Sequence, residues 1–290
     1  MVIQKEKNIL ILGATGMIGH MLYYYLEETK KYNLFNAGNK NKLSDSTIIA
    51  DFTNQNSIED IINKVQPDII LNCAGVLISE ANDNPGRAVL LNSYLPLMLE
   101  RITRGSATRL IQFSTDCVFS GRNGPYDESD LKDADDKYGR SKSLGEIDNH
   151  KDITIRTSTI GPELKSEGEG LFHWFNSQEG TISGYSEVYW SGVTTLELAK
   201  AVNYLIESEF VGLAHLTNGQ SISKYNLLLL LQKIWTKDNL KIKKSDSRKL
   251  NKSLNMSKLL QYEVPTYEKM IKEMMEWMLL HREIYNNYRL

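Results

Sequence analysis

The sequence predicts an α/β fold, in which a Rossmann-like, doubly wound parallel sheet carries helices on both faces and a smaller C-terminal part follows. Near the N-terminus a glycine-rich turn joins a strand-length apolar run, Asn8 to Leu12, to a helical pattern, Met17 to Leu26. Further strand-length and helical segments alternate through short links, which is typical of a parallel sheet covered by helices. From about Gly161 a charged, glycine-rich loop interrupts the alternation. We therefore expect a sheet domain over residues 1–160.

The composition is that of an ordinary globular enzyme, with 290 residues, of which 41% are hydrophobic and 24% charged. The formal net charge of −2 gives no concentrated basic face for a nucleic acid or a membrane surface. No apolar run approaches the roughly 20 residues of a membrane span, and the first six residues hold no signal-peptide core. We expect a cytoplasmic protein without a nucleic-acid or membrane partner, and the sequence leaves open whether it forms a homodimer.

The glycine turn lies in the stretch Lys7 to Gly19, KNILILGATGMIG. The spacing G-x-x-G-x-x-G allows a tight turn, a close approach of a phosphate to bare backbone, and close packing of helix on strand. The N-terminus of the helix also offers unpaired N–H groups to an anion. The stretch predicts a dinucleotide-binding βαβ unit, with these residues at the cofactor: Gly13, Thr15, Gly16, Met17, Ile18 and Gly19.

The second strand, Tyr32 to Ala37, ends at Gly38, Asn39 and Lys40. In dinucleotide-binding folds an acid near this position takes the ribose hydroxyls, whereas a neutral or basic residue leaves room for a 2′-phosphate. Asn39 and Lys40 therefore favour NADPH, with NADH left open. After a third short strand, Thr47 to Ala50, Asp51 and Phe52 are placed beside the adenine, unless Asp51 only caps a turn.

The fourth and fifth strands are expected at Ile69 to Asn72 and Arg109 to Ser114. The small residues Cys73, Ala74 and Gly75 follow the fourth strand and would let backbone lie against the cofactor. Cys73 and Cys117 are expected to be free thiols, and nothing in their spacing suggests a metal site.

Helices are expected between these strands. Ser57 is the predicted cap of a helix that runs to about Val65. A longer helix, Asn84 to about Arg104, carries Asn92 on its inner face, where a buried amide needs partners and a structural role is expected.

Tyr138 and Lys142 are four residues apart in YGRSK, which puts a phenol and an ammonium on one face of a helix. A neighbouring cation favours the phenolate and should lower a pKa that starts near 10, so that the tyrosine can pass a proton. The alternative for such a pair is an ordinary contact on a helix surface.

Together these features resemble the extended short-chain dehydrogenase/reductase family, and within it the dTDP-4-dehydrorhamnose reductase group. The glycine turn, an NCAG stretch and the YxxxK pair occur in the family's order. The stretches that resemble the reductase group cover most of the chain: Ser114 to Gly121, Tyr126 to Asp130, Tyr138 to Glu146, Arg156 to Ser158 and His215 to Tyr225.

The resemblance implies an NAD(P)H-dependent reductase of a nucleotide-activated 4-keto-6-deoxy sugar, which supplies a deoxyhexose for surface polysaccharide. It implies that Thr115, Tyr138 and Lys142 are catalytic. Tyr138 would give the proton to the developing alkoxide, Thr115 would orient that oxygen, and Lys142 would tune Tyr138 and hold the nicotinamide ribose. Tyr138 and Lys142 therefore count as cofactor residues too.

The same resemblance implies that residues 161–290 form mainly a substrate-binding lobe, with a segment of about 192–216 returning to the main domain. The residues implied at the substrate are Cys117, Val118, Phe119, Thr159, Trp190, Arg248 and Lys252. The helical and strand patterns expected in this part are Leu171 to Phe175, Thr195 to Ser208, Gly212 to Leu216, Lys224 to Trp235 and Tyr267 to about Tyr288.

Two residues differ from those usual in the reductase group, at positions that lie near the sugar in that group. Cys117 stands where the group usually has tyrosine, and Thr159 where it has tryptophan. A cysteine at this place also resembles bifunctional 3,5-epimerase/4-reductases, in which the thiol moves protons beside the ketone; a thiol that fills space is the alternative. A non-catalytic, NADP-binding regulatory subunit of methionine adenosyltransferase resembles the same group and is the rival from another class. The nucleotide, dTDP, UDP, GDP or CDP, stays open.

Overall fold

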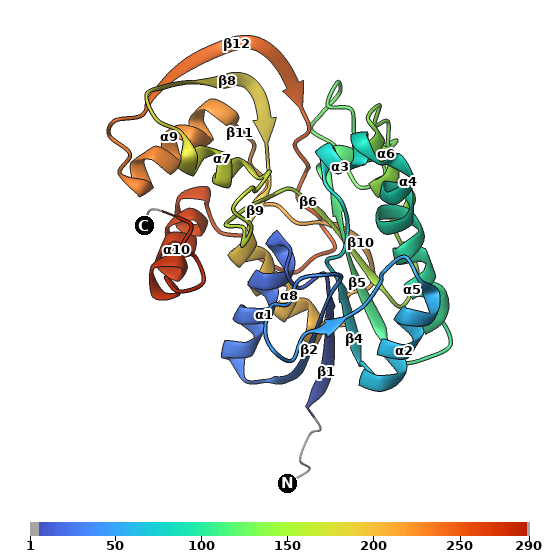
Figure 1. Ribbon diagram of the computed structural model, residues 1–290. Helices are drawn as coiled ribbons and strands as arrows, with labels where there is room; N and C mark the ends of the chain where they lie inside the picture. The colour runs from blue at the N-terminus through green and yellow to red at the C-terminus, as the bar shows by residue number, and fades with distance from the viewer. Residues whose placement is uncertain (1–5, 289–290) are drawn as a thin grey trace.

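The computed structural model describes residues 6–288, which form a main parallel sheet and a smaller lobe (Figure 1). The main sheet has seven strands in the order β10-β6-β5-β4-β1-β2-β3, and every neighbouring pair is parallel. Its strands are β1 Lys7–Leu12, β2 Tyr32–Gly38, β3 Ile48–Ile49, β4 Ile69–Asn72, β5 Arg109–Thr115, β6 Ile153–Thr157 and β10 Gly212–His215. The order reverses between β1 and β4, and in such sheets ligands bind at the carboxyl ends of the strands beside the reversal.

Helices cover both faces of the main sheet, as the sequence predicts. On one face lie α1 Met17–Thr29 and α8 Thr195–Glu207, and on the other α2 Gln55–Val65 and α5 Leu95–Thr103 (Figure 1). Along β1 the side chains alternate, so that Ile9 and Ile11 join the first core and Leu10 and Leu12 join the second. Each fully buried aliphatic side chain contributes about 1.5–3 kcal/mol relative to exposure, so the two cores hold the sheet between its helix layers.

Two predicted helix features differ in the structure. The cap of α2 is Asn54 and not Ser57, because the Asn54 side chain accepts the Asn56 N–H at 2.9 Å. The long helix is divided into α4 Pro85–Ala88, the π-helix η1 Val89–Tyr94 and α5, with α3 Ile78–Asp83 before them. Pro96 has no N–H to offer the carbonyl four residues back, which agrees with a change of helix type at this point.

Asn92, on η1, has the structural role that the sequence predicts. Its side-chain oxygen accepts the Val76 N–H at 2.9 Å, and its amide donates to the Val76 carbonyl at 3.1 Å and to the Ser141 hydroxyl at 3.0 Å. These bonds hold the loop after β4 against α6, Lys137–Leu144.

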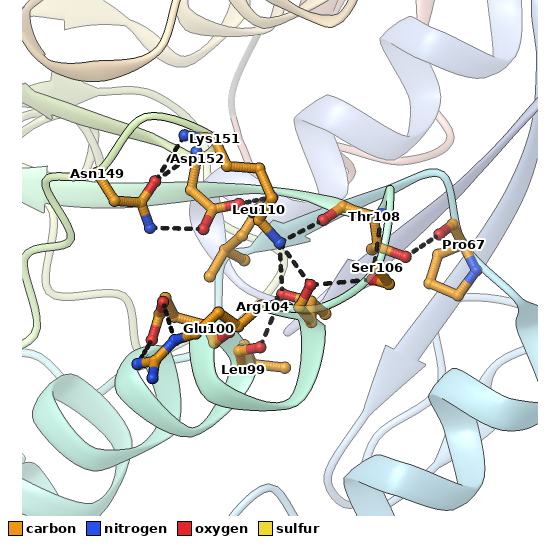
Figure 2. Close-up of polar contacts among 11 residues, drawn as sticks. Pro67, Leu99, Glu100, Arg104, Ser106, Thr108, Leu110, Asn149, Lys151 and Asp152 are labelled. Atoms are coloured by element: carbon orange, nitrogen blue, oxygen red, sulfur yellow. Dashed lines mark hydrogen bonds and ion pairs between the residues drawn. The ribbon is translucent and has the colours of Figure 1, made fainter.

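A polar network joins the amino ends of β5 and β6 (Figure 2). The Lys151 ammonium donates to the carbonyls of Thr103 and Thr108 at 2.7 and 2.8 Å. The buried Asp152 carboxylate accepts the Leu110 N–H at 2.9 Å. Because a buried charge without such partners costs several kcal/mol, the network fixes the start of β5 and so the direction of its other end.

The C-terminal part forms a second sheet of three strands, in the order β11-β8-β12. Its elements are α7 Leu171–Ser177, β8 Thr181–Trp190, β11 Ile222–Ser223, α9 Lys224–Trp235, β12 Lys241–Asn251 and α10 Tyr267–Leu280. Figure 1 shows β8 and β12 arching together beyond the main sheet. Two short strands, β7 Thr159–Ile160 and β9 Val193–Thr194, pair with each other. Between these elements the chain returns to the main domain, where α8 packs on α1 and β10 pairs with β6.

The last helix is shorter than the sequence predicts. α10 ends at Leu280, because His281 leaves helical geometry and the chain turns back. Tyr285 then lies in the interior, with its hydroxyl 3.3 Å from the Trp277 ring nitrogen and 3.3 Å from His20 on α1. The apolar stripe of α10 is core, as expected: Met270, Met274, Trp277 and Met278 are all buried.

Replacing Gly13 by alanine is expected to lower the free energy of unfolding by about 2–5 kcal/mol. Gly13 has φ +77°, and a Cβ there would come within 2.7 Å of the Ala74 backbone nitrogen. Gly105→Ala is the control, since a Cβ at Gly105 meets nothing within 4 Å. Urea unfolding measures both, and equal midpoints would contradict this account of the turn.

Candidate active site

A cleft of about 280 Å³ opens at the carboxyl ends of the central strands. The start of α1 contributes Met17 and Ile18 to its wall, and the loop after β4 contributes Cys73, Ala74 and Gly75. Other residues of the wall come from the end of β5, from α6, from the end of β6 and from the loop before α7: Thr115, Asp116, Cys117, Tyr138, Lys142, Thr157, Ser158, Thr159, Glu169 and Gly170. The cleft thus lies where the strand order reverses.

The glycine turn directly precedes Met17 and Ile18 of the cleft wall and consists of tightly held backbone. The N–H groups of Gly13 and Ala14 both donate to the Ala37 carbonyl at 3.0 Å, and Gly16 N–H donates to the Gly13 carbonyl at 3.0 Å. Within residues 6–288 no side chain caps the N-terminus of α1. Free N–H groups at a helix N-terminus beside glycine backbone fit the phosphates of a dinucleotide.

Thr115 ends β5 and turns the chain into the short 3-10 helix η2, Asp116–Val118. Its hydroxyl oxygen accepts the Cys117 N–H at 3.1 Å and its hydroxyl donates to the Asp116 carboxylate at 3.1 Å. A hydrogen bond also links Thr115 to the hydroxyl of Tyr138. The structure therefore brings Thr115 and Tyr138 together at the cleft.

Burial, followed by the neighbouring Cys117, raises the pKa of Tyr138, while the hydrogen bond from Thr115 lowers it. The prediction that this pKa is lowered is wrong, because burial outweighs the other influences and raises it. The phenol consequently stays protonated over the neutral range.

Lys142 lies one helical turn after Tyr138 on α6. Its ammonium donates to the Phe113 carbonyl of β5 at 2.6 Å. Burial lowers the pKa of Lys142 to about 8, against the influence of Glu146 and Cys73, which raise it. Lys142 is thus a partly desolvated cation that remains mostly charged at neutral pH.

The residues predicted for the adenosine end lie beyond this cleft. Asn39 and Lys40 follow β2 and are half-buried and exposed, respectively. Asp51 is exposed and accepts the N–H and hydroxyl of Thr53 at 2.9 and 2.7 Å, so it caps a turn, the alternative that the sequence left open. Phe52 is buried in the second core.

The residues predicted for the substrate fall into two groups. Cys117 and Thr159 line the cleft. Val118, Phe119 and Trp190 have interior side chains that do not line it, with 0%, 0% and 2% exposure. Phe119 stacks on Tyr126 with ring centroids 4.1 Å apart, and Trp190 packs on Tyr267 at 5.6 Å.

The two predicted cations are also separated. Arg248 is exposed on β12. Lys252 lies closer to the cleft, with its ammonium 3.9 Å from the carboxylate of Asp136, which caps α6.

Sequence reasoning missed Asp116 and Lys224. Asp116 is buried in the wall of the cleft; burial raises its pKa, and the charges of Lys224 and Lys252 lower it. Lys224 begins α9, with its ammonium 5.4 Å from the ring centre of Trp190, and burial lowers its pKa to about 8. The sequence offered one indication of Lys224, because it lies in the stretch His215 to Tyr225 that resembles the reductase group. Its position near Asp116 follows only from the fold.

Among residues 6–288, no group of three or more histidine, cysteine or acidic side chains is placed to hold a metal ion. In the same part of the chain, no helix combines the length and the apolar character needed to cross a membrane.

A glycine turn at the reversal of a Rossmann-type sheet, with threonine, tyrosine and lysine converging beside it, defines an extended short-chain dehydrogenase/reductase. The model of the RmlD substrate binding domain family matches residues 7–278. The chain belongs to that family.

Comparisons with individual proteins agree with this assignment. The chain is 25% identical over 235 residues to the dTDP-4-dehydrorhamnose reductase of Salmonella typhimurium, a match that covers 77% of each chain. It is 29% identical over 141 residues to methionine adenosyltransferase 2 subunit beta of Danio rerio, covering 48% of this chain and 42% of that protein. The crystal structure of dTDP-4-dehydrorhamnose reductase from Bacillus anthracis in complex with NADP has the same fold, with a TM-score of 0.79, 21% identity, and coverage of 94% of this chain and 100% of that chain.

The thiol of Cys117 is expected to react slowly although it lines the cleft. Burial, together with the carboxylate of Asp116, raises the pKa of Cys117 to about 12. Since the thiolate is the nucleophile, iodoacetamide at pH 8 should alkylate native Cys117 at least about 100-fold more slowly than the urea-unfolded chain. Peptide mass spectrometry measures both rates, and equal rates would show that the site does not suppress the thiolate.

Proposed function

We propose that the protein is an NADPH-dependent reductase of a nucleotide-activated 4-keto-6-deoxy sugar, acting in deoxyhexose synthesis for surface polysaccharide. The observation that carries the proposal is the convergence of Thr115, Tyr138 and Lys142 on a cleft whose wall also includes Met17 and Ile18, which directly follow the glycine turn. The dTDP-4-dehydrorhamnose reductases among the relatives support the substrate class.

The glycine turn, the start of α1 and the loop after β4 would hold the cofactor. The bare backbone from Gly13 to Gly19 and the uncapped N–H groups of α1 suit the two phosphates. Asn39 and Lys40 at the end of β2 support NADPH over NADH, because no carboxylate stands there to repel a 2′-phosphate. NADPH, when bound, supplies a hydride to the carbonyl carbon of the sugar.

The protein's own side chains would handle the oxygen and the proton. Tyr138 is a neutral phenol in the neutral range and can donate its proton to the oxygen as negative charge develops there. The Thr115 hydroxyl, which donates to Asp116 in the structure, would rotate to donate a second hydrogen bond to that oxygen, as donors in an oxyanion site do. Lys142, anchored on Phe113, would add positive charge beside the phenol and bind the ribose.

The C-terminal lobe would bind the nucleotide sugar. Cys117 and Thr159 lie in the wall of the cleft, and Lys252 offers a cation beside it for the diphosphate. Arg248, exposed on β12, would reach the diphosphate only from the arch that β8 and β12 form.

Neither rival function is favoured. A thiol with its pKa near 12 is poorly suited to the proton transfers that a 3,5-epimerase needs. A non-catalytic subunit has no use for the complete set of Thr115, Tyr138 and Lys142.

We further propose that the enzyme works in the cytoplasm, where NADPH and nucleotide sugars are made, as a homodimer. An exposed helical patch on η1, α5 and α6 consists of Val89, Leu90, Tyr94, Leu97 and Leu144, which are 41–66% exposed. A patch of this kind suits a symmetric contact with a second copy.

Sedimentation of the wild type should therefore give twice the mass of one chain, and Leu97→Glu should halve it, because a charge in the contact would be desolvated. Leu280→Glu is the control, since Leu280 is exposed on α10, away from the patch (Figure 1). A monomeric wild type would contradict the dimer.

Tyr138→Phe is expected to reduce turnover by a factor on the order of 100 or more while NADPH affinity stays close to that of the wild type, because only the proton donor is lost. NADPH oxidation is followed with dTDP-, UDP-, GDP- and CDP-linked 4-keto-6-deoxyhexoses. Tyr204→Phe is the control, since it removes the hydroxyl of an exposed tyrosine on α8. No oxidation by the wild type with any of these sugars would refute the proposed function, and full turnover by Tyr138→Phe would refute the role of Tyr138.

A further inference from the structure

A buried carboxylate, Glu146, lies behind the proposed catalytic residues. Glu146 follows α6, four residues after Lys142, and its side chain is only 2% exposed. The Ser114 hydroxyl donates to its carboxylate at 2.6 Å. Glu146 is not among the residues that form the wall of the cleft.

Glu146 and Lys142 are anchored on successive residues of β5. The Lys142 ammonium donates to the Phe113 carbonyl at 2.6 Å, and the next residue, Ser114, bonds Glu146. Thr115 follows Ser114 directly. Lys142 and Glu146 therefore hold Phe113 and Ser114 in place. These residues directly precede Thr115, whose hydroxyl must point into the cleft.

Cations from other elements hold Glu146 in its ionised form. The guanidinium of Arg156 on β6 donates to both carboxylate oxygens, at 2.9 and 2.8 Å, and the Lys132 ammonium lies 3.1 Å away. Burial alone would favour protonation, but Arg156, Ser114 and Lys132 outweigh it and lower the pKa of Glu146. A carboxylate thus remains charged in the interior beside the active site.

The surroundings of Arg156 belong to the same network. Its other nitrogen lies 2.9 Å from the Nε2 atom of His215 on β10, and its guanidinium lies 5.0 Å from the ring centre of Phe119. Burial and the charge of Arg156 lower the pKa of His215, and the Glu128 carboxylate accepts the backbone N–H of His215 at 3.1 Å. At neutral pH the cluster consequently presents Glu146 to Lys142 as a negative charge.

The titratable groups near Lys142 come from two parts of the chain, α6 with the residues after it and the end of β4. Glu146 and Tyr138 lie on its own side, around α6, and Cys73 follows β4. Burial raises the pKa of Cys73, so this thiol is neutral at physiological pH. Burial raises the pKa of Tyr138 as well, and the phenol is neutral too. The negative charge that opposes the desolvation of Lys142 therefore comes from Glu146.

We propose that Glu146 is a positioning residue of the reductase site. Through its hydrogen bond with Ser114 it orients Thr115, and its carboxylate keeps Lys142 in the charged form. This inference rests on the proposed function for its catalytic meaning. Its electrostatic part concerns Lys142 alone and is measurable in the protein without cofactor.

The test is the pKa of the Lys142 amine, obtained by competitive labelling with trace acetic anhydride across a pH series. Lys142 lines the cleft, so a small reagent can reach it. Glu146→Gln should lower this pKa by about one unit or more, since an opposite charge nearby shifts a pKa by roughly 1–3 units. Glu146→Asp keeps the charge and should keep the pKa near that of the wild type.

Glu146→Gln leaves Arg156 buried beside a neutral partner and is expected to destabilise the fold. The double variant Glu146→Gln, Arg156→Met removes both charges, so it should regain much of the melting temperature while keeping the lowered pKa of Lys142. A Lys142 pKa equal to the wild-type value in this folded double variant would overturn the inference.

The pH profile of kcat/KM gives the second reading. Reduction requires charged Lys142. The alkaline limb of the profile should therefore move to lower pH in Glu146→Gln and in the double variant, by the same shift in the pKa of Lys142 that labelling measures. A limb that stays in place while the labelled pKa moves would overturn the link to catalysis. A wild type without reductase activity would overturn the proposed function and leave the labelling result to decide the electrostatic part.

Discussion

The close approach of bare backbone at Gly13 is the constraint on which the rest of the structure depends. Gly13 and Ala14 share the Ala37 carbonyl, and a Cβ on Gly13 would come within 2.7 Å of Ala74. The ends of β1, β2 and β4 are thereby held at one point of the sheet edge. This contact directs the uncapped start of α1 toward the cleft and brings the loop after β4 into the cleft wall beside it.

Desolvation controls the chemistry that the cleft can support. Burial raises the pKa of Tyr138 and Cys117 and lowers that of Lys142 to about 8. A phenol that keeps its proton suits the reduction of a carbonyl, in which the tyrosine must give a proton away. The same burial leaves the neighbouring thiol inert, so the site favours reduction over proton exchange beside the ketone.

The parts of the site that the sequence predicts are those with a local signal. The glycine spacing identifies the turn at Gly13, and the four-residue spacing of Tyr138 and Lys142 identifies the pair on α6, because both depend on neighbours in the chain. Lys224 beside Asp116 depends on how two distant segments pack, which no local pattern reports. The early end of α10 has the same cause, because Tyr285 packs against His20 from α1.

The most direct test of the account follows the hydride itself. The wild type is incubated with NADPH that carries deuterium at the transferred position and with the nucleotide-linked 4-keto-6-deoxyhexose that it reduces best. Mass and NMR spectra of the product should place one deuterium on C4 of the sugar and none on the carbons beside it. Oxidation of the cofactor without deuterium at C4 would contradict a reductase that acts on this carbonyl.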